Sequence, residues 1–200
     1  MTLPVPAEEY VARFHREQAS NREVMLRPQF HLDHAALALD RLDRALLAHA
    51  ELLYEPCMRG RIVEGHGDLR PEHVCMIDPP VIIDCLEFNA QLRQVDPFDE
   101  VAFLGLECSL AGADWVMPRL IAGLSAALDD RPPPGLIHLY TAQRALLRAR
   151  LAMAHLLDPQ PRTPQKWSPL AQRYVQRALA ALDDLEGYCP LGDAPVFAAR

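Results

Sequence analysis

Apolar residues recur every three or four positions over most of the chain, which is the pattern of amphipathic α-helices. The stretch 32–54 shows this pattern most clearly, because it contains no glycine or proline. The helices that the pattern predicts are residues 7–24, 32–54, 97–111, 115–128, 136–157 and 170–185. The sequence therefore predicts a mainly α-helical protein.

Two of these predicted helices begin with capping signals. Asp96 is a good N-cap, Pro97 suits the first helical position, and Asp99 completes a pair that resembles a capping box. Asp114 is expected to cap the helix that starts at Trp115. These signals place the starts of both helices within a residue or two.

Two short β-branched runs interrupt the helical pattern. They are Val74 to Ile77 and Val81 to Ile83, and the turn signal Asp78-Pro79-Pro80 separates them. We expect an antiparallel hairpin of two buried strands. The predicted fold class is thus mainly α with a small β-hairpin (α+β).

Polar residues gather in the loops on either side of this hairpin, within the segment Gly65 to Asn89. Asp68 and His73 precede the first strand, and Asp84 follows the second strand. Pairing of the strands would bring these three side chains to one end of a rigid support. We expect the functional site there.

Composition narrows the class of protein. The 200 residues suit a single domain, and 50% apolar with 24% charged residues is typical of a globular chain. The net charge is −7 and no basic run occurs, so we expect neither a nucleic-acid partner nor an anionic membrane partner. No apolar run approaches the ~20 residues that span a bilayer, and the N-terminus does not resemble a signal peptide. We therefore expect a cytoplasmic protein.

The five cysteines form an odd set without a Cys-x-x-Cys pair, which favours reduced thiols over a disulfide framework. Cys75 and Cys85 lie in or beside the predicted strands, and we expect both to be small buried hydrophobic residues. The alternative is a zinc site that includes His66 or His73.

The segment HGDLRPEH, residues 66–73, resembles the catalytic loop of the protein-kinase-like fold. Its first three residues resemble the aminoglycoside phosphotransferase and choline kinase branch in particular. IDCLEFN at 83–89, followed by VDPFDEVAFL at 95–104, resembles a bacterial subgroup of these phosphotransferases. The resemblance covers roughly residues 60–157, and it rests on two linked motifs at a suitable separation.

The resemblance implies an ATP-dependent phosphotransferase (kinase) that acts on a hydroxyl of a small molecule, with Mg²⁺ and ATP as cofactors. It implies that Asp68 positions the acceptor hydroxyl and that Asp84 binds magnesium on the nucleotide phosphates. His73 stands where the family usually has a metal-binding Asn. Arg70 stands where many protein kinases have a lysine, and it adds positive charge near the transferred phosphoryl group.

Neighbouring polar residues are assigned supporting roles. We expect His66 to brace the loop through hydrogen bonds. Asp99 either caps its helix or also holds the backbone of the catalytic loop, as an aspartate on the corresponding helix does in related folds. Glu87 and Asn89 are expected to close a turn, the alternatives being contact with a substrate or a metal.

The chain resembles the C-terminal catalytic lobe of the kinase-like fold alone. About sixty residues precede the catalytic loop, no G-x-G-x-x-G motif occurs, and Lys166 is the sole lysine. We expect the N-terminal nucleotide lobe to be absent from this chain. Two alternatives to an active kinase lobe stay open: a non-catalytic binding or scaffold module, and one piece of a two-part enzyme whose nucleotide lobe another polypeptide supplies.

The predicted organisation is a single domain over residues 1–200. Residues 60–111 form its catalytic-loop and metal-loop core, and residues 188–200 form a flexible tail. A missing lobe would leave an apolar face, which either the N-terminal helix within residues 1–29 covers or self-association buries. The side chains expected to make this contact are Val5, Tyr10, Phe14 and Met25.

Overall fold

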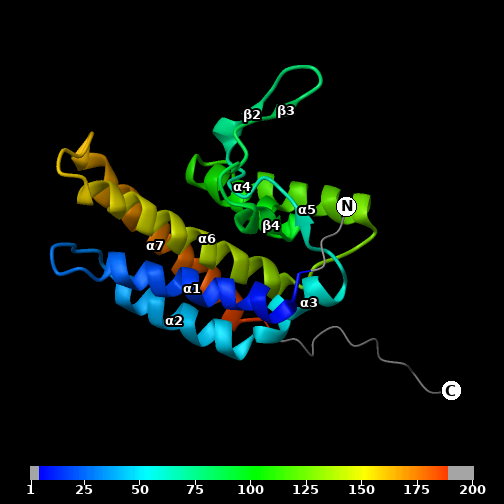
Figure 1. The fold of residues 1–200 in the computed structure, drawn as a ribbon, viewed down its shortest axis with the longest axis horizontal. Helices are drawn as coiled ribbons and strands as arrows, with labels where there is room; N and C mark the ends of the chain where they lie inside the picture. The colour runs from blue at the N-terminus through cyan, green and yellow to red at the C-terminus, as the bar shows by residue number, and fades with distance from the viewer. Residues whose placement is uncertain (1–4, 189–200) are drawn as a thin grey trace.

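Helices make up most of the computed structural model, which describes residues 5–188 (Figure 1). The α-helices in this range are α1 (Ala7–Met25), α2 (Ala35–Ala48), α3 (Ala50–Met58), α4 (Pro97–Leu110), α5 (Val116–Leu128), α6 (Pro134–Ala154) and α7 (Pro164–Glu186). Single 3₁₀ turns are η1 (Pro71–His73), η2 (Ala90–Arg93) and η3 (His155–Leu157). The predicted mainly α fold class is confirmed at this level.

The strands are short and pair in two antiparallel sheets of two strands each. The predicted hairpin is present as β2 (Val74–Cys75) and β3 (Val81–Ile82), and it projects away from the helices in Figure 1. The second pair joins β1 (Val63–Glu64) to β4 (Gln94–Val95). This second pair was not predicted, because neither two-residue strand carries an alternating pattern of its own.

Helix α6 lies at the centre of the helical body, where α1, α4 and α7 pack against it. Alanines on α6 let these neighbours approach closely, and large apolar side chains fill the space between them. The fully buried side chains of α6 include Leu136, Leu139, Tyr140, Ala142, Ala145, Leu146 and Ala149. Helix α4 and the loops that precede it therefore lie against one side of α6.

A buried arginine ties several loops to the start of α4. Arg61 is 6% exposed, and its guanidinium pairs with Asp96, Glu55 and Asp130 at 3.0, 2.5 and 2.9 Å. Asp96 also accepts a hydrogen bond from the Tyr140 hydroxyl at 3.0 Å. The segment that leads into β1 is thus fixed against α4 and α6 by charge-assisted hydrogen bonds.

The prediction of a single helix over residues 32–54 is wrong, because the helix breaks at His49 and forms α2 and α3. The buried stripe of α2 contains Leu39, Leu42 and Leu46. An unbroken helix would bring His49 next onto that stripe, toward the apolar core. The break instead lets α3 turn Leu52 inward while the imidazole stays partly exposed.

Two other helix starts differ from the prediction. Asp96 caps α4 as expected, accepting the Phe98 amide at 3.0 Å. Asp114 does not cap α5, whose N-cap is Trp115, and its carboxylate lies 3.4 Å from Arg177 instead. Helix α7 begins six residues earlier than position 170, at Pro164, because proline is compatible with the first turn of a helix.

The hairpin strands are exposed, so the prediction that they are buried is wrong. Exposed fractions are 83% for Met76, 62% for Ile77 and 56% for Ile82. Cys75 is half-buried and Cys85 is exposed, so the expectation of burial fails for these thiols too. The β-branched runs predicted pairing correctly, but no element of the described chain covers the hairpin.

The N-terminal helix is part of the core and does not cover the hairpin. Tyr10, Phe14 and Met25 are each at most 4% exposed, and Val5 is half-buried against the same core. The Tyr10 hydroxyl lies 3.3 Å from that of Tyr140 on α6. Self-association stays a prediction. The predicted tail lies outside the described residues, apart from its first residue.

Within residues 5–188, no helix is both long and apolar enough to cross a membrane.

Phe14→Ala should lower the free energy of unfolding by about 3–5 kcal/mol, because Phe14 is 4% exposed and a cavity would remain between α1 and α6. Phe88→Ala, at a position that is 81% exposed, is the matched control and should change stability little. Urea unfolding followed by circular dichroism measures both. Equal effects from the two variants would contradict the placement of α1 in the core.

Candidate functional site

A carboxylate on α4 holds the loop that contains Asp68. Glu100 is 7% exposed, and its two oxygens accept the backbone amides of His66 and Gly67 at 2.8 and 2.7 Å. The next amide, that of Asp68, donates to Nδ1 of His66 at 3.2 Å. Each amide of residues 66–68 therefore has an acceptor.

The three carbonyl oxygens of this loop also accept hydrogen bonds. The pairs are His66 with the Leu86 amide (3.1 Å), Gly67 with the Arg144 guanidinium (3.3 Å) and Asp68 with Nδ1 of His73 (2.8 Å). Every backbone polar group of residues 66–68 is thus paired, although the loop belongs to no helix or strand. The direction in which Asp68 projects is set by this network.

Glycine is required on both sides of His66. The backbone of Gly67 has φ +85°, and a Cβ there would lie 2.8 Å from the Leu92 carbonyl oxygen. A Cβ on Gly65 would lie 2.5 Å from Cγ2 of Val95. The loop therefore lies too close to the residues around β4 to admit side chains at these two positions.

The hairpin returns Asp84 to the loop. His66 Nε2 lies 2.7 Å from the Ile83 carbonyl oxygen, and the Ile83 amide donates to the His73 carbonyl oxygen at 2.9 Å. These contacts fix the position of the residue that follows β3. As a result, Oδ2 of Asp84 lies 3.4 Å from Nε2 of His73. The expectation that His66 braces the loop is confirmed by its bonds to both loops.

Asp84 adopts a left-handed backbone conformation, with φ +62°. Aspartate tolerates this region better than most residues, yet it is uncommon and often marks functional turns. The side chain is 78% exposed, whereas that of His73 is 6% exposed. The carboxylate therefore faces outward from a buried imidazole.

Arg70 joins the two halves of the site. Its Nε lies 3.0 Å from Oδ2 of Asp68, and its terminal nitrogen lies 3.1 Å from Nε2 of His73. His73 Nδ1 donates to the Asp68 carbonyl, so Nε2 of the neutral ring is the acceptor that faces Arg70 and Asp84. The structure thus brings together all four sequence-predicted site residues.

The residue that holds the backbone of the loop at 66–68 is Glu100, so the alternative that gave this role to Asp99 is wrong. Asp99 instead accepts two hydrogen bonds of 2.8 Å from Arg144. Neighbouring residues on a helix point about 100° apart, and only Glu100 faces the loop. Sequence reasoning missed both Glu100 and Arg144, although the acidic pair Asp99-Glu100 in the first turn was a visible signal.

Burial raises the pKa of Glu100 above that of a free carboxyl group. Arg144 and the amides of His66 and Gly67 act in the opposite direction, because they favour the charged carboxylate. The loop is therefore held by a desolvated acid whose partners offset part of the cost of its charge.

Asn89 closes a turn, as expected, by accepting the Gln91 amide at 2.9 Å. Glu87 is exposed. Both lie in the segment that follows Asp84, and this segment forms one wall of the cavity beside Asp68.

The resemblance implies a magnesium ion at Asp84 that is shared with a ligand. Mg²⁺ usually takes one or two protein carboxylates and completes its shell with water and phosphate oxygens. The exposed Asp84 carboxylate is such a donor, and Nε2 of His73 lies behind it. Residues 5–188 contain no cluster of three His, Cys, Asp or Glu side chains able to hold a metal, so the zinc alternative finds no closed ligand set there.

A cavity of about 430 Å³ opens beside Asp68. It lies between the loop at 66–70, α1, α6 and the segment after Asp84, and both Asp68 and Arg70 line it. Its volume is in the range of small-molecule sites. The candidate catalytic carboxylate therefore faces a space that can hold a substrate.

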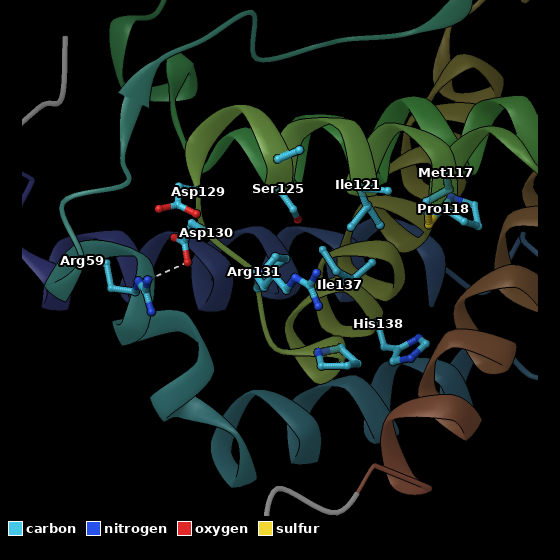
Figure 2. A pocket seen from close by; sticks show the side chains of 14 residues that line it. Arg59, Met117, Pro118, Ile121, Ser125, Asp129, Asp130, Arg131, Ile137 and His138 are labelled. Carbon is cyan, nitrogen blue, oxygen red and sulfur yellow. Dashed lines mark ion pairs between the residues drawn. The ribbon is translucent and has the colours of Figure 1, made fainter. Parts of the chain in front are cut away.

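A larger hollow of about 1060 Å³ lies elsewhere, along α5 and the start of α6 (Figure 2). Met117, Ile121 and Ile137 line it, and an ion pair of 2.6 Å between Arg59 and Asp130 lies at one end. None of the four predicted site residues lines this hollow. Its size alone does not make it the functional site.

Comparisons with known proteins find a partial likeness. The chain is 33% identical over 103 residues to the uncharacterized protein Rv2004c of Mycobacterium tuberculosis. The same values hold for the uncharacterized protein Mb2027c of Mycobacterium bovis. The aligned part is 51% of this chain and 21% of each relative, so the chain spans only a small part of these curated relatives. No family model and no solved structure matches the chain.

Glu100→Gln should destabilise the protein by about 1–3 kcal/mol, because the amide offers one oxygen for two buried N–H groups. The amides of His66 and Gly67 should also exchange faster with solvent. Glu23→Gln, at an exposed position on α1, is the matched control and should have little effect. Urea unfolding and hydrogen exchange measure both; unchanged exchange at these two amides would refute the role of Glu100.

Proposed function

We propose that the chain is the C-terminal catalytic lobe of an ATP-dependent phosphotransferase of the aminoglycoside phosphotransferase-like class. Residues 60–111 would form its catalytic and metal-binding segment, and a hydroxyl of a small molecule would be the acceptor. The observation that carries this proposal is the return of Asp84 to His73 by the hairpin, beside a rigidly held Asp68. Phosphoryl transfer requires one carboxylate to position the hydroxyl and another to bind the metal; Asp68 lines the cavity, and the hairpin brings Asp84 to His73 near it.

In the proposed reaction, Asp68 accepts a hydrogen bond from the acceptor hydroxyl and takes its proton. The hydroxyl oxygen forms a bond to the γ-phosphorus of ATP, and the bond from that phosphorus to the β,γ-bridging oxygen breaks. A phosphate monoester and ADP are the products. The paired backbone of residues 66–68 supports this role, because it fixes the position of the carboxylate before a substrate binds.

Asp84, with His73 beside it, would hold Mg²⁺, which neutralises charge on the nucleotide phosphates when bound. Arg70 would add a guanidinium near the transferred phosphoryl group. Its hydrogen bonds to Asp68 and His73 support this role, because they hold the guanidinium beside the carboxylate that would receive the acceptor hydroxyl.

The nucleotide lobe would come from another part of a longer polypeptide or from a second polypeptide. Two observations support this step: the likeness covers 21% of each relative, and the hairpin leaves Met76, Ile77 and Ile82 exposed. Contiguous exposed apolar side chains are typical of interaction surfaces. The neighbouring coding sequence is expected to encode a glycine-rich phosphate loop.

A second candidate function is a non-catalytic module that binds a small molecule or a protein. The specific observation in its favour is that Arg70 already occupies both Asp68 and Nε2 of His73. A guanidinium that is hydrogen-bonded to the carboxylate competes with an acceptor hydroxyl for the same oxygens. Nucleotide binding separates the two functions.

Asp68→Asn should lower the rate of phosphate transfer from ATP to small alcohols by roughly 10²- to 10⁴-fold, since the amide cannot take the hydroxyl proton. Asp158→Asn, an exposed position beyond α6, is the matched control and should keep the wild-type rate. Transfer from radiolabelled ATP to a panel of alcohols and aminoglycosides is measured on the chain together with the polypeptide that supplies the nucleotide lobe. Equal background rates from the wild type and Asp68→Asn would reject the proposal.

Calorimetry with ATP, on the chain together with the polypeptide that supplies the nucleotide lobe, should reveal nucleotide binding that depends on Mg²⁺. Asp84→Asn should weaken this binding by at least about tenfold, because it removes the carboxylate that the ion requires. Asp158→Asn again serves as the control. ATP binding that is absent, or that is identical with and without Mg²⁺, would favour the non-catalytic module.

A further inference from the structure

The cavity beside Asp68 carries an excess of positive charge. Five arginines and three acidic residues line it, in a chain whose net charge is −7. The arginines are Arg13, Arg70, Arg144, Arg148 and Arg150. The net charge of the residues that line the cavity is thus opposite in sign to the net charge of the whole protein.

Four of these arginines are engaged by carboxylates, and Arg150, paired with Glu17, is described separately below. Arg70 pairs with Asp68 and Arg144 with Asp99, as described above. Arg148 lies 2.8 Å from a carboxylate oxygen of Glu107. Their charges are therefore balanced within the protein.

Arg13 on α1 has no carboxylate partner among residues 5–188. Its guanidinium donates to the carbonyl oxygens of Gln91 and Gln94 at 3.3 and 2.7 Å, and it lies over the rings of Tyr10 and Phe14. These contacts fix the position of the group but leave its charge uncompensated. Such a group attracts an anion.

Arg150 on α6 is only partly satisfied. One terminal nitrogen pairs with Glu17 of α1, while its buried Nε has no acceptor in the described part of the chain. An unpaired buried N–H is costly, and an oxyanion that draws the guanidinium toward it would supply an acceptor. Arg13, Glu17 and Arg150 all line the cavity and carry one net positive charge together, and we refer to this part of the lining as the anion-binding end.

The other end of the cavity is marked by Arg144, which contacts the Gly67 carbonyl next to Asp68. Arg144 and Arg150 are six residues apart on α6, which corresponds to about 9 Å along the helix. Leu147 and Leu151 of α6 and Leu86 line the space as well. These dimensions suit a compact ligand with a hydroxyl at one end and a charged group at the other.

We propose that the phosphoryl acceptor is a small hydroxylated molecule that carries an oxyanion, either a carboxylate or a phosphate. Arg13 and Arg150 bind the oxyanion, and the hydroxyl lies at Asp68. This inference rests on the proposed function and names its acceptor class. A polycationic aminoglycoside is disfavoured, because its ammonium groups would meet the uncompensated guanidinium of Arg13.

The test compares sugars of one size and different charge by calorimetry on the full chain. The probes are glucose, gluconate, glucose 6-phosphate and glucosamine. At least one of the two anionic probes should bind at least about tenfold more tightly than glucose, and glucosamine should bind no better than glucose. Added salt should weaken the anionic complexes and leave the glucose complex unchanged. Equal affinity for all four probes, or tightest binding of glucosamine, would overturn the inference.

Arg13→Gln and Arg150→Gln should each lower the affinity for the anionic probe about tenfold without changing that for glucose. Arg119→Gln removes the same charge from an exposed position on α5 and should leave every affinity unchanged. Arg13 packs on two aromatic rings, so Arg13→Lys is included as a variant that keeps the charge. Arg13→Lys should retain part of the preference for the anionic probe over glucose. Anion binding that survives both Gln variants would overturn the assignment.

These binding measurements need neither ATP nor turnover. Loss of anion binding in Arg13→Gln and Arg150→Gln supports the anion-binding end even if no phosphate transfer is detected, in which case only the proposed function fails. Transfer that depends on Asp68 but prefers glucosamine would contradict the acceptor class alone.

Discussion

Two hydrogen bonds from backbone amides to the carboxylate of Glu100 determine where Asp68 points. The loop at 66–68 has no regular secondary structure, so its polar groups need partners from elsewhere in the chain. Glu100 supplies acceptors for two amides, and Arg144 supplies a donor for a carbonyl. The position of the Asp68 carboxylate therefore depends on the position of the first turn of α4.

The first turn of α4 is held in place by two buried arginines. Arg61 binds Asp96 from the chain before β1, and Arg144 binds Asp99 from α6. Removing either partner of such a pair leaves a buried charge uncompensated, which is strongly destabilising. These ion pairs link the packing of the helical core to the geometry of the candidate site, since α4 and α6 cannot shift without moving the loop.

The N-terminal helix contributes to both the core and the site. Phe14 is buried against Tyr140, with ring centroids 6.0 Å apart, while Arg13 and Glu17 line the cavity beside Asp68. The walls of that cavity come from α1, α6 and the segment after Asp84. The proposed acceptor specificity thus depends on residues more than fifty positions away from the catalytic loop, whereas the proposed chemistry lies within residues 66–84.

The sequence by itself determined the helices, the hairpin, the cap at Asp96 and the segment that holds the four predicted site residues. These features follow from local periodicity, turn residues and short-range spacing. Tertiary packing decided the break at His49, the exposure of the hairpin strands and the choice of Glu100 over Asp99 as the residue that holds the loop. Each of these depends on which side of an element meets a partner far away in sequence, and a local pattern does not contain that information.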